Sequence, residues 1–129
     1  TTWAYWHTSY VESPMPGVTL RLEHGQTTIA ADLMRRPAPS PSELASEAAR
    51  VREAIRAEME AGAKELSIAD YWRTPLELMY SGHEDLAWKF FDDAWPTGVS
   101  GRDEFLREFR ELLDQSVYWN RAKAAFDAE

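Results

Sequence analysis

A proline-rich segment at residues 35–42, Arg-Arg-Pro-Ala-Pro-Ser-Pro-Ser, constrains the fold of this chain more than any other feature. It holds three prolines in eight residues and no apolar side chain larger than alanine, which is typical of a stiff, extended connector. The sequence patterns on its two sides differ. The segment therefore divides the chain into a strand-type region, residues 1–34, and a helical region, residues 43–129.

The region before the connector has the composition and alternation of β-strands. Residues 3–12 are rich in Trp, Tyr, Thr and Val and end at a Ser-Pro-Met-Pro-Gly break. In residues 18–23 three apolar side chains alternate with Thr, Arg and Glu, which indicates a strand with one face in water. Gly25-Gln26 suits a two-residue hairpin turn, and residues 27–34 follow as a third strand, although Ala-Ala-Asp-Leu-Met could equally begin a helix.

The clearest helix start follows the connector. Ser-Pro-Ser-Glu at residues 40–43 is a capping box with proline at the first helical position. An apolar stripe with helical spacing then predicts a one-sided helix that ends at Gly62. The stripe consists of Leu44, Ala48, Val51, Ile55 and Met59.

Further helices are expected along the rest of the chain. Thr-Pro-Leu-Glu at residues 74–77 repeats the capping-box pattern and predicts a short helix that closes at Gly82. Residues 83–95 carry a wide apolar face before Pro96 and predict the helix at the centre of the core. Residues 63–73 show no clear pattern.

Two more segments near the end of the chain have helical spacing. Ser100 is the candidate N-cap of an amphipathic helix, and a final turn or two follows within residues 117–126. The expected buried face of the first comprises Phe105, Leu106, Phe109, Leu112 and Leu113, and that of the second comprises Val117, Tyr118, Ala122 and Phe126.

Residues 76–96 resemble one helical hairpin of the tetratricopeptide kind. A small residue stands at the tight turn, and Ala87, Phe91 and Ala94 stand where such hairpins place their packing residues. No copy recurs about 34 residues later, the period that a solenoid of these repeats requires. The segment therefore predicts an antiparallel helix pair and no family.

Together these patterns predict an α+β fold in a single domain, residues 1–129. A small N-terminal antiparallel hairpin or three-stranded sheet precedes a C-terminal bundle of four to five helices. The chain has no cysteine, which excludes disulfides and thiolate chemistry. No apolar run approaches the roughly 18 residues of a membrane span, so no membrane insertion is expected. Its first residue, Thr1, fits either a cytoplasmic protein or one exported after removal of a leader.

The charge of the chain is concentrated after the connector. Residues 1–39 hold equal numbers of basic and acidic side chains, whereas residues 40–129 hold eleven basic against nineteen acidic ones and supply the whole net charge of −8. An acidic surface repels phosphate backbones and anionic lipids, so a nucleic-acid partner is not expected. A basic or neutral protein fits better, in a hetero-complex or a homo-oligomer.

The sequence shows no convincing catalytic or metal-binding set. Among the histidines His7, His24 and His83, only His83 has adjacent acids, and their side chains point off its helix face. His83 is therefore expected to serve as a residue at a helix start. Asp92 and its neighbour diverge by about 100° in a helix and cannot share a proton. The expectation is no catalytic residue, no metal and no cofactor.

One ion-pair spacing and one glycine-containing loop also stand out in the sequence. Asp85 and Lys89 have the i, i+4 spacing of a surface ion pair. The Gly-Val-Ser-Gly sequence at residues 98–101 lacks the lysine and the length of a phosphate-binding loop. Neither pattern indicates an active site.

The aromatic residues are the best candidates for a contact surface. In a strand over residues 3–12, Trp3 and Tyr5 would point to one face and Trp6 and Tyr10 to the other, so both faces would be aromatic. Two further pairs lie outside the strongest helical stripes. The candidate interaction residues are Trp3, Tyr5, Trp6, Tyr10, Tyr71, Trp72, Tyr118 and Trp119.

Three classes of function follow from these observations. The leading one is a non-catalytic protein–protein interaction module, an accessory subunit or adaptor that docks through aromatic surface and acidic helices. The first alternative is a small-ligand or carbohydrate-binding domain that stacks Trp and Tyr on its ligand. The second alternative is a small enzyme that uses a histidine and a distant carboxylate.

Overall fold

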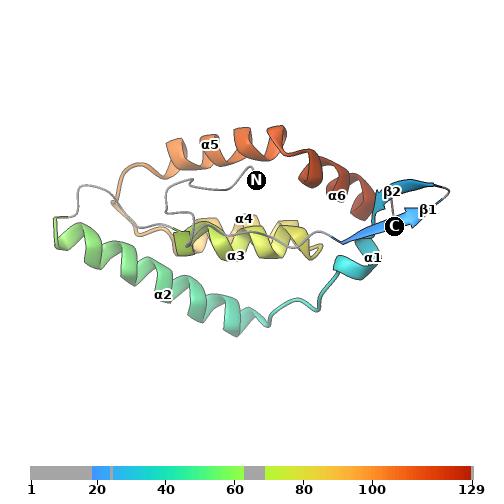
Figure 1. Ribbon diagram of the computed structural model, residues 1–129. Coiled ribbons are helices and arrows are strands. Elements are labelled where there is room, and N and C mark those ends of the chain that lie inside the picture. The colour runs from blue at the N-terminus through green and yellow to red at the C-terminus, as the bar shows by residue number, and fades with distance from the viewer. Residues whose placement is uncertain (1–18, 24, 63–68, 129) are drawn as a thin grey trace.

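The computed structural model describes residues 19–23, 25–62 and 69–128, and these form an α+β fold that is mostly helical. Helices lie in three layers (Figure 1). The middle layer is the antiparallel pair α3 and α4, with α2 on one side and α5 and α6 on the other. The helices are α2 (Pro41–Glu60), α3 (Ala69–Tyr80), α4 (Glu84–Ala94), α5 (Arg102–Gln115) and α6 (Val117–Asp127).

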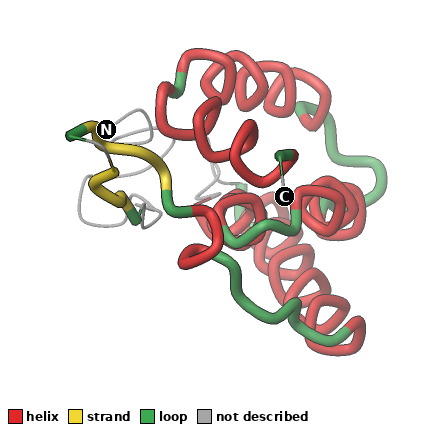
Figure 2. The backbone as a smooth tube through the Cα atoms, turned by 90° about the vertical axis from the view of Figure 1, so that its right-hand side faces the viewer, coloured by secondary structure: helices red, strands yellow, loops and turns green. Residues whose placement is uncertain are grey.

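A two-stranded hairpin and a short helix lie at one end of these layers (Figure 1), the end that faces the viewer in Figure 2. Strand β1 (Leu20–Glu23) pairs antiparallel with β2 (Gln26–Ile29), and Leu20 stands opposite Ile29. Gln26 belongs to β2, so the turn lies one residue earlier than predicted, with Gly25 at φ 77°. The predicted strand over residues 3–12 lies outside the described residues.

The predicted third strand is wrong beyond Ile29, and the alternative of a helix start is confirmed. Residues Ala31–Met34 form helix α1. Ala30, Ala31 and Met34 are buried, a spacing that a helical turn can direct to one side and a strand cannot. Burial in the core therefore decides the backbone conformation of this ambiguous segment.

The capping box after the connector is confirmed. The Glu43 backbone N–H donates to Ser40 Oγ at 3.1 Å, and the Ser40 backbone N–H donates to Glu43 Oε2 at 3.4 Å. Ala48, Val51 and Ile55 are buried, whereas Met59 is exposed, so the predicted stripe leaves the core in the last turn of α2. Helix α2 packs on α4, where Arg52 also donates to the Asp93 carbonyl at 2.6 Å.

The predicted helix start at residues 74–77 is wrong, because α3 already includes Ala69 and continues through Pro75. A proline inside a helix removes one backbone hydrogen bond and costs roughly 3 kcal/mol. Tyr71 and Trp72, on the turn before it, are fully buried, and their packing outweighs this cost. The predicted end at Gly82 is confirmed by two bonds, from the His83 N–H to the Leu78 carbonyl and from the Gly82 N–H to the Met79 carbonyl.

The last two helices also differ in detail from the prediction. The N-cap of α5 is Gly101, at φ 103° and with no side-chain cap bond, and not Ser100. In α6, Ser116 Oγ accepts from the Trp119 N–H, and Trp119 and Ala122 face the core. Val117 and Tyr118 are exposed, so the expected face of this helix is rotated.

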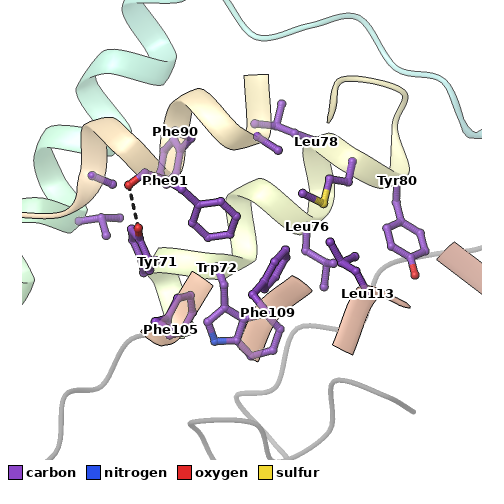
Figure 3. Close-up of a cluster of buried hydrophobic side chains, with 14 of the residues drawn as sticks. Tyr71, Trp72, Leu76, Leu78, Tyr80, Phe90, Phe91, Phe105, Phe109 and Leu113 are labelled. Atoms are coloured by element: carbon purple, nitrogen blue, oxygen red, sulfur yellow. Dashed lines mark hydrogen bonds between the residues drawn. The ribbon is translucent and has the colours of Figure 1, made fainter. Parts of the chain in front are cut away.

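The centre of the core is a cluster of aromatic rings between α3, α4 and α5 (Figure 3). The Tyr71 ring lies 5.1 Å from those of Phe91 and Trp95 and 5.2 Å from Phe105. Its hydroxyl donates to the Phe91 carbonyl at 2.7 Å. Helix α5 therefore packs on the middle layer through large rings. None of the helices in the described ranges is long and apolar enough to cross a membrane.

Candidate functional site

The predicted aromatic contact residues separate into three groups. Trp3, Tyr5, Trp6 and Tyr10 lie outside the described residues. Tyr71, Trp72 and Trp119 are buried in the core, and this burial corrects the expectation that their rings are available on the surface of the folded chain. Tyr118 is 50% exposed. Of the eight candidates, Tyr118 is thus the one that the described part of the chain presents to solvent.

The hairpin exposes apolar side chains to water, which the alternating sequence pattern does not predict. Leu22 is 74% exposed and Leu20 is 45% exposed. Both lie on the same face of β1 as Ile29, which stands directly opposite Leu20 and packs against the core. This face, the hairpin leucine face, therefore begins on the core and continues into solvent. Leu33 on α1 is 53% exposed as well.

The hairpin is fixed to the helices by polar contacts. Arg121 on α6 donates to the Thr27 carbonyl at 2.8 Å. The Ala30 N–H donates to the Thr19 carbonyl at 2.8 Å, which joins the two arms of the hairpin directly before α1. On the opposite face of β1, Arg21 pairs with Asp32 of α1 at 2.8 Å and lowers the pKa of that carboxyl. The hairpin that carries the two leucines is thus held in place against α1 and α6.

A pocket of about 430 Å³ lies where the start of α4 meets α6 and the end of α1. Trp119 and Phe126 supply aromatic walls, and the rim carries Arg35, His83 and the carboxylate and ammonium groups of α4 and α6. We call it the His83 pocket. The Arg35 guanidinium lies 4.9 Å from the centre of the Phe126 ring.

The polar groups of the His83 pocket are already engaged with one another. His83 Nε2 lies 2.5 Å from the Arg36 carbonyl, so the tautomer with hydrogen on Nε2 donates there. Lys123 Nζ lies 2.7 Å from Glu84 Oε2, and this hydrogen bond raises the pKa of Lys123. A lysine held in its charged form is a poor proton acceptor. His83 thus connects the connector to the start of α4, as its predicted place at a helix start suggests.

The predicted Asp85–Lys89 ion pair is replaced by another of the same spacing. Lys89 Nζ lies 2.9 Å from Asp93 Oδ2, one turn further along α4. Asp92 instead pairs with Arg102 of α5. Adjacent carboxylates therefore bind different cations, which agrees with their expected divergence. No group of three or more metal-ligating side chains gathers within residues 19–23, 25–62 and 69–128.

A second pocket, of about 390 Å³, lies between α4 and α5. Trp88, Phe91 and Asp92 line it from α4, and a row of side chains from α5 forms the other wall, namely Arg102, Asp103, Leu106, Arg107 and Arg110. We call it the α4–α5 pocket. Sequence reasoning missed it because its two walls are 10 or more residues apart in the chain and meet only in the fold.

Comparisons of the chain with protein-family models, with curated proteins and with solved structures find no match. Only the chain's own residues and their geometry therefore bear on its function.

Proposed function

We propose that this chain is a non-catalytic protein-docking module and that the hairpin leucine face is the centre of its contact surface. The observation that carries the proposal is the exposure of Leu22 and Leu20 on one face of an anchored hairpin. Full burial of one leucine contributes roughly 1.5–3 kcal/mol. A partner that covers both side chains therefore gains a substantial part of its binding free energy there.

The charge of the chain indicates the kind of partner. Each copy carries a net charge of −8, so two copies repel one another as they approach. A basic or neutral protein does not meet this repulsion, and a basic one is attracted by the net negative charge of the chain. The proposed assembly is therefore a hetero-complex with another protein.

A capture experiment tests this proposal. The tagged chain is used to capture proteins from cells of its source. The double variant Leu20→Ser/Leu22→Ser is compared with Val117→Ser, which removes another exposed apolar side chain, on α6. Loss of two leucine contacts weakens the affinity for a partner by about 100-fold. A stoichiometric partner should therefore bind the control and not the double variant. Equal capture by both variants would contradict the proposal.

Small-ligand binding in the His83 pocket is the second candidate, favoured by the aromatic walls that Trp119 and Phe126 give it. Its cations are paired with groups of the chain itself, so an incoming ligand must compete with these contacts. Tryptophan fluorescence titrated with a sugar panel tests this candidate, and no change across the panel would remove it. For the enzyme alternative, His83 is engaged with a backbone carbonyl, and His7 and His24 lie outside the described residues.

A further inference from the structure

The α4–α5 pocket has an unusual charge for this acidic chain. Five residues of α5 line this pocket, and three of them are arginines; the other two are Asp103 and Leu106. Arg107 and Arg110 are three residues apart, so their side chains lie on adjacent turns of one helix face. The pocket therefore concentrates positive charge in a chain whose net charge is −8.

The three arginines differ in what they already bind. Arg102 pairs with Asp92 across the pocket and lies 3.4 Å from Asp103. Arg110 lies 4.4 Å from the centre of the Trp88 ring, and neither it nor Arg107 has an ion pair with a carboxylate in the described part of the chain. Both carboxylates of the lining are thus near Arg102, and two guanidinium groups are left without an anion.

The apolar wall limits the shape of a ligand. Trp88 and Leu106 are half-buried, and the Trp88 indole N–H is directed to Glu84 Oε1 at 3.4 Å, which fixes the ring. A volume of about 390 Å³ exceeds what an inorganic oxyanion needs and lies within the usual range of small-molecule sites. A ligand that fills it therefore carries a flat apolar group beside its anion.

We propose that the α4–α5 pocket binds a small phosphate monoester carried on an aromatic ring. Two guanidinium groups match the nearly two negative charges of a phosphate monoester at neutral pH better than the single charge of a carboxylate. The planar fork of arginine binds two phosphate oxygens at once. The ring of the ligand packs on Leu106 and the edge of Trp88. This site shares no residue with the hairpin leucine face, so each proposal stands or fails separately.

Phenyl phosphate is the probe, titrated into the full chain at low ionic strength. The indole N–H resonance of Trp88 in nitrogen–proton NMR spectra reports on the pocket, and its assignment comes from a Trp88→Phe variant. We expect one saturable site with a dissociation constant of about 1 mM, typical of a ligand of this size. Arg107→Gln/Arg110→Gln should weaken binding at least about 10-fold, because each lost charged hydrogen bond lowers affinity strongly.

Arg56→Gln is the matched control, since it removes an exposed arginine on α2, outside the pocket, and should leave the affinity unchanged. Arg107→Lys keeps the positive charge but loses the planar guanidinium group. Its affinity for phenyl phosphate should lie between those of the double variant and the control. Circular dichroism establishes that each variant is folded. Absence of saturable binding, or equal affinity in the double variant and the control, would overturn the site. Benzoate or inorganic phosphate binding as tightly as phenyl phosphate would overturn the assigned ligand class.

Discussion

At the scale of single residues, Tyr71 shows why a ring that the sequence predicts to lie on the surface is buried in the folded chain. Its ring is surrounded by Phe91, Trp95 and Phe105, and its hydroxyl donates to a backbone carbonyl. Nothing in the neighbouring sequence indicates this, because these three partner residues lie at least 20 residues away in the chain. The same holds for Trp72 on the next position of α3. Ring exposure is therefore a property of the tertiary structure.

The buried Tyr71 hydroxyl should make the chain sensitive to alkali. Burial raises the pKa of Tyr71 above its ordinary value of 10.0. The neutral phenol thus stabilises the fold fully below pH 10, and this contribution is lost as the pH rises, because the unfolded chain ionises first. The free energy of unfolding should fall by up to about 1.4 kcal/mol per pH unit above pH 10 for this group.

Chemical denaturation at pH 9 to 11 measures this effect in Tyr71→Phe and in Tyr118→Phe, whose ring is half-exposed. The free energy of unfolding of Tyr71→Phe should be lower by about 1 kcal/mol at neutral pH because the hydrogen bond is missing. It should also fall less steeply as the pH rises above 10. Equal slopes in the two variants would show that the Tyr71 phenol is not the titrating group.

Gly82 should be harder to replace than Gly98, although both have positive φ, 92° and 83°. A Cβ at either position introduces left-handed strain of about 1–2 kcal/mol. At Gly82 the Cβ would also lie 2.5 Å from Arg35 Nη1, whereas at Gly98 it meets nothing within 4 Å. Arg35 must then move off the Phe126 ring, which costs about 0.5–1 kcal/mol more.

Thermal and denaturant unfolding of Gly82→Ala and Gly98→Ala measure this difference. In an Arg35→Ala background the extra cost at Gly82 should disappear. If the two alanine variants are equally stable in the wild-type background, the Arg35 contact does not contribute.

At the scale of elements, local chemistry predicts helix ends well only where nothing competes with it. The capping box at Ser40 and Glu43 needs only residues next to one another, and it is found in the structure. The same pattern at residues 74–77 fails because burial of Tyr71 and Trp72 extends α3 past Pro75. The end of β2 and the start of α1 are decided by packing in the same way. Tertiary contacts therefore override propensity at these places.

Loss of the Ser40 cap should weaken the fold. Ser40→Ala removes the acceptor for the Glu43 N–H and should lower the free energy of unfolding by about 1 kcal/mol. Ser46→Ala, an exposed position inside α2, should leave stability unchanged or slightly higher because alanine favours helices. Urea denaturation followed by circular dichroism compares the two, and an equal effect at both positions would contradict the capping role.

At the scale of the whole molecule, the sequence predicts the class of fold and the acidic surface but not the candidate sites. Alternation at Leu20 and Leu22 predicts a strand, yet it does not tell whether the apolar face is covered. The rotated face of α6 brings Trp119 to the core and leaves Tyr118 outside. The two pockets arise only where α4 meets α5 and α6. Surfaces made from distant segments need the packed structure.

The hairpin leucines should contribute little to stability. Leu22→Ala removes a side chain that is 74% exposed and should change the free energy of unfolding by less than about 0.5 kcal/mol. Leu76→Ala, the same change at a fully buried position of α3, should cost about 2–5 kcal/mol. Denaturant unfolding measures both. A loss at Leu22 comparable to that at Leu76 would show that the fold, rather than a partner, needs this leucine.

The docking role of the hairpin is tested most directly by site-specific crosslinking in cells of the protein's source. A photoreactive amino acid replaces Leu22 in one variant and Val117 in another, and the adducts formed on illumination are separated by mass. We expect one discrete adduct with another protein at position 22 and none of that mass at position 117. A chain that forms no adduct at position 22, or forms one only with its own copies, would contradict it.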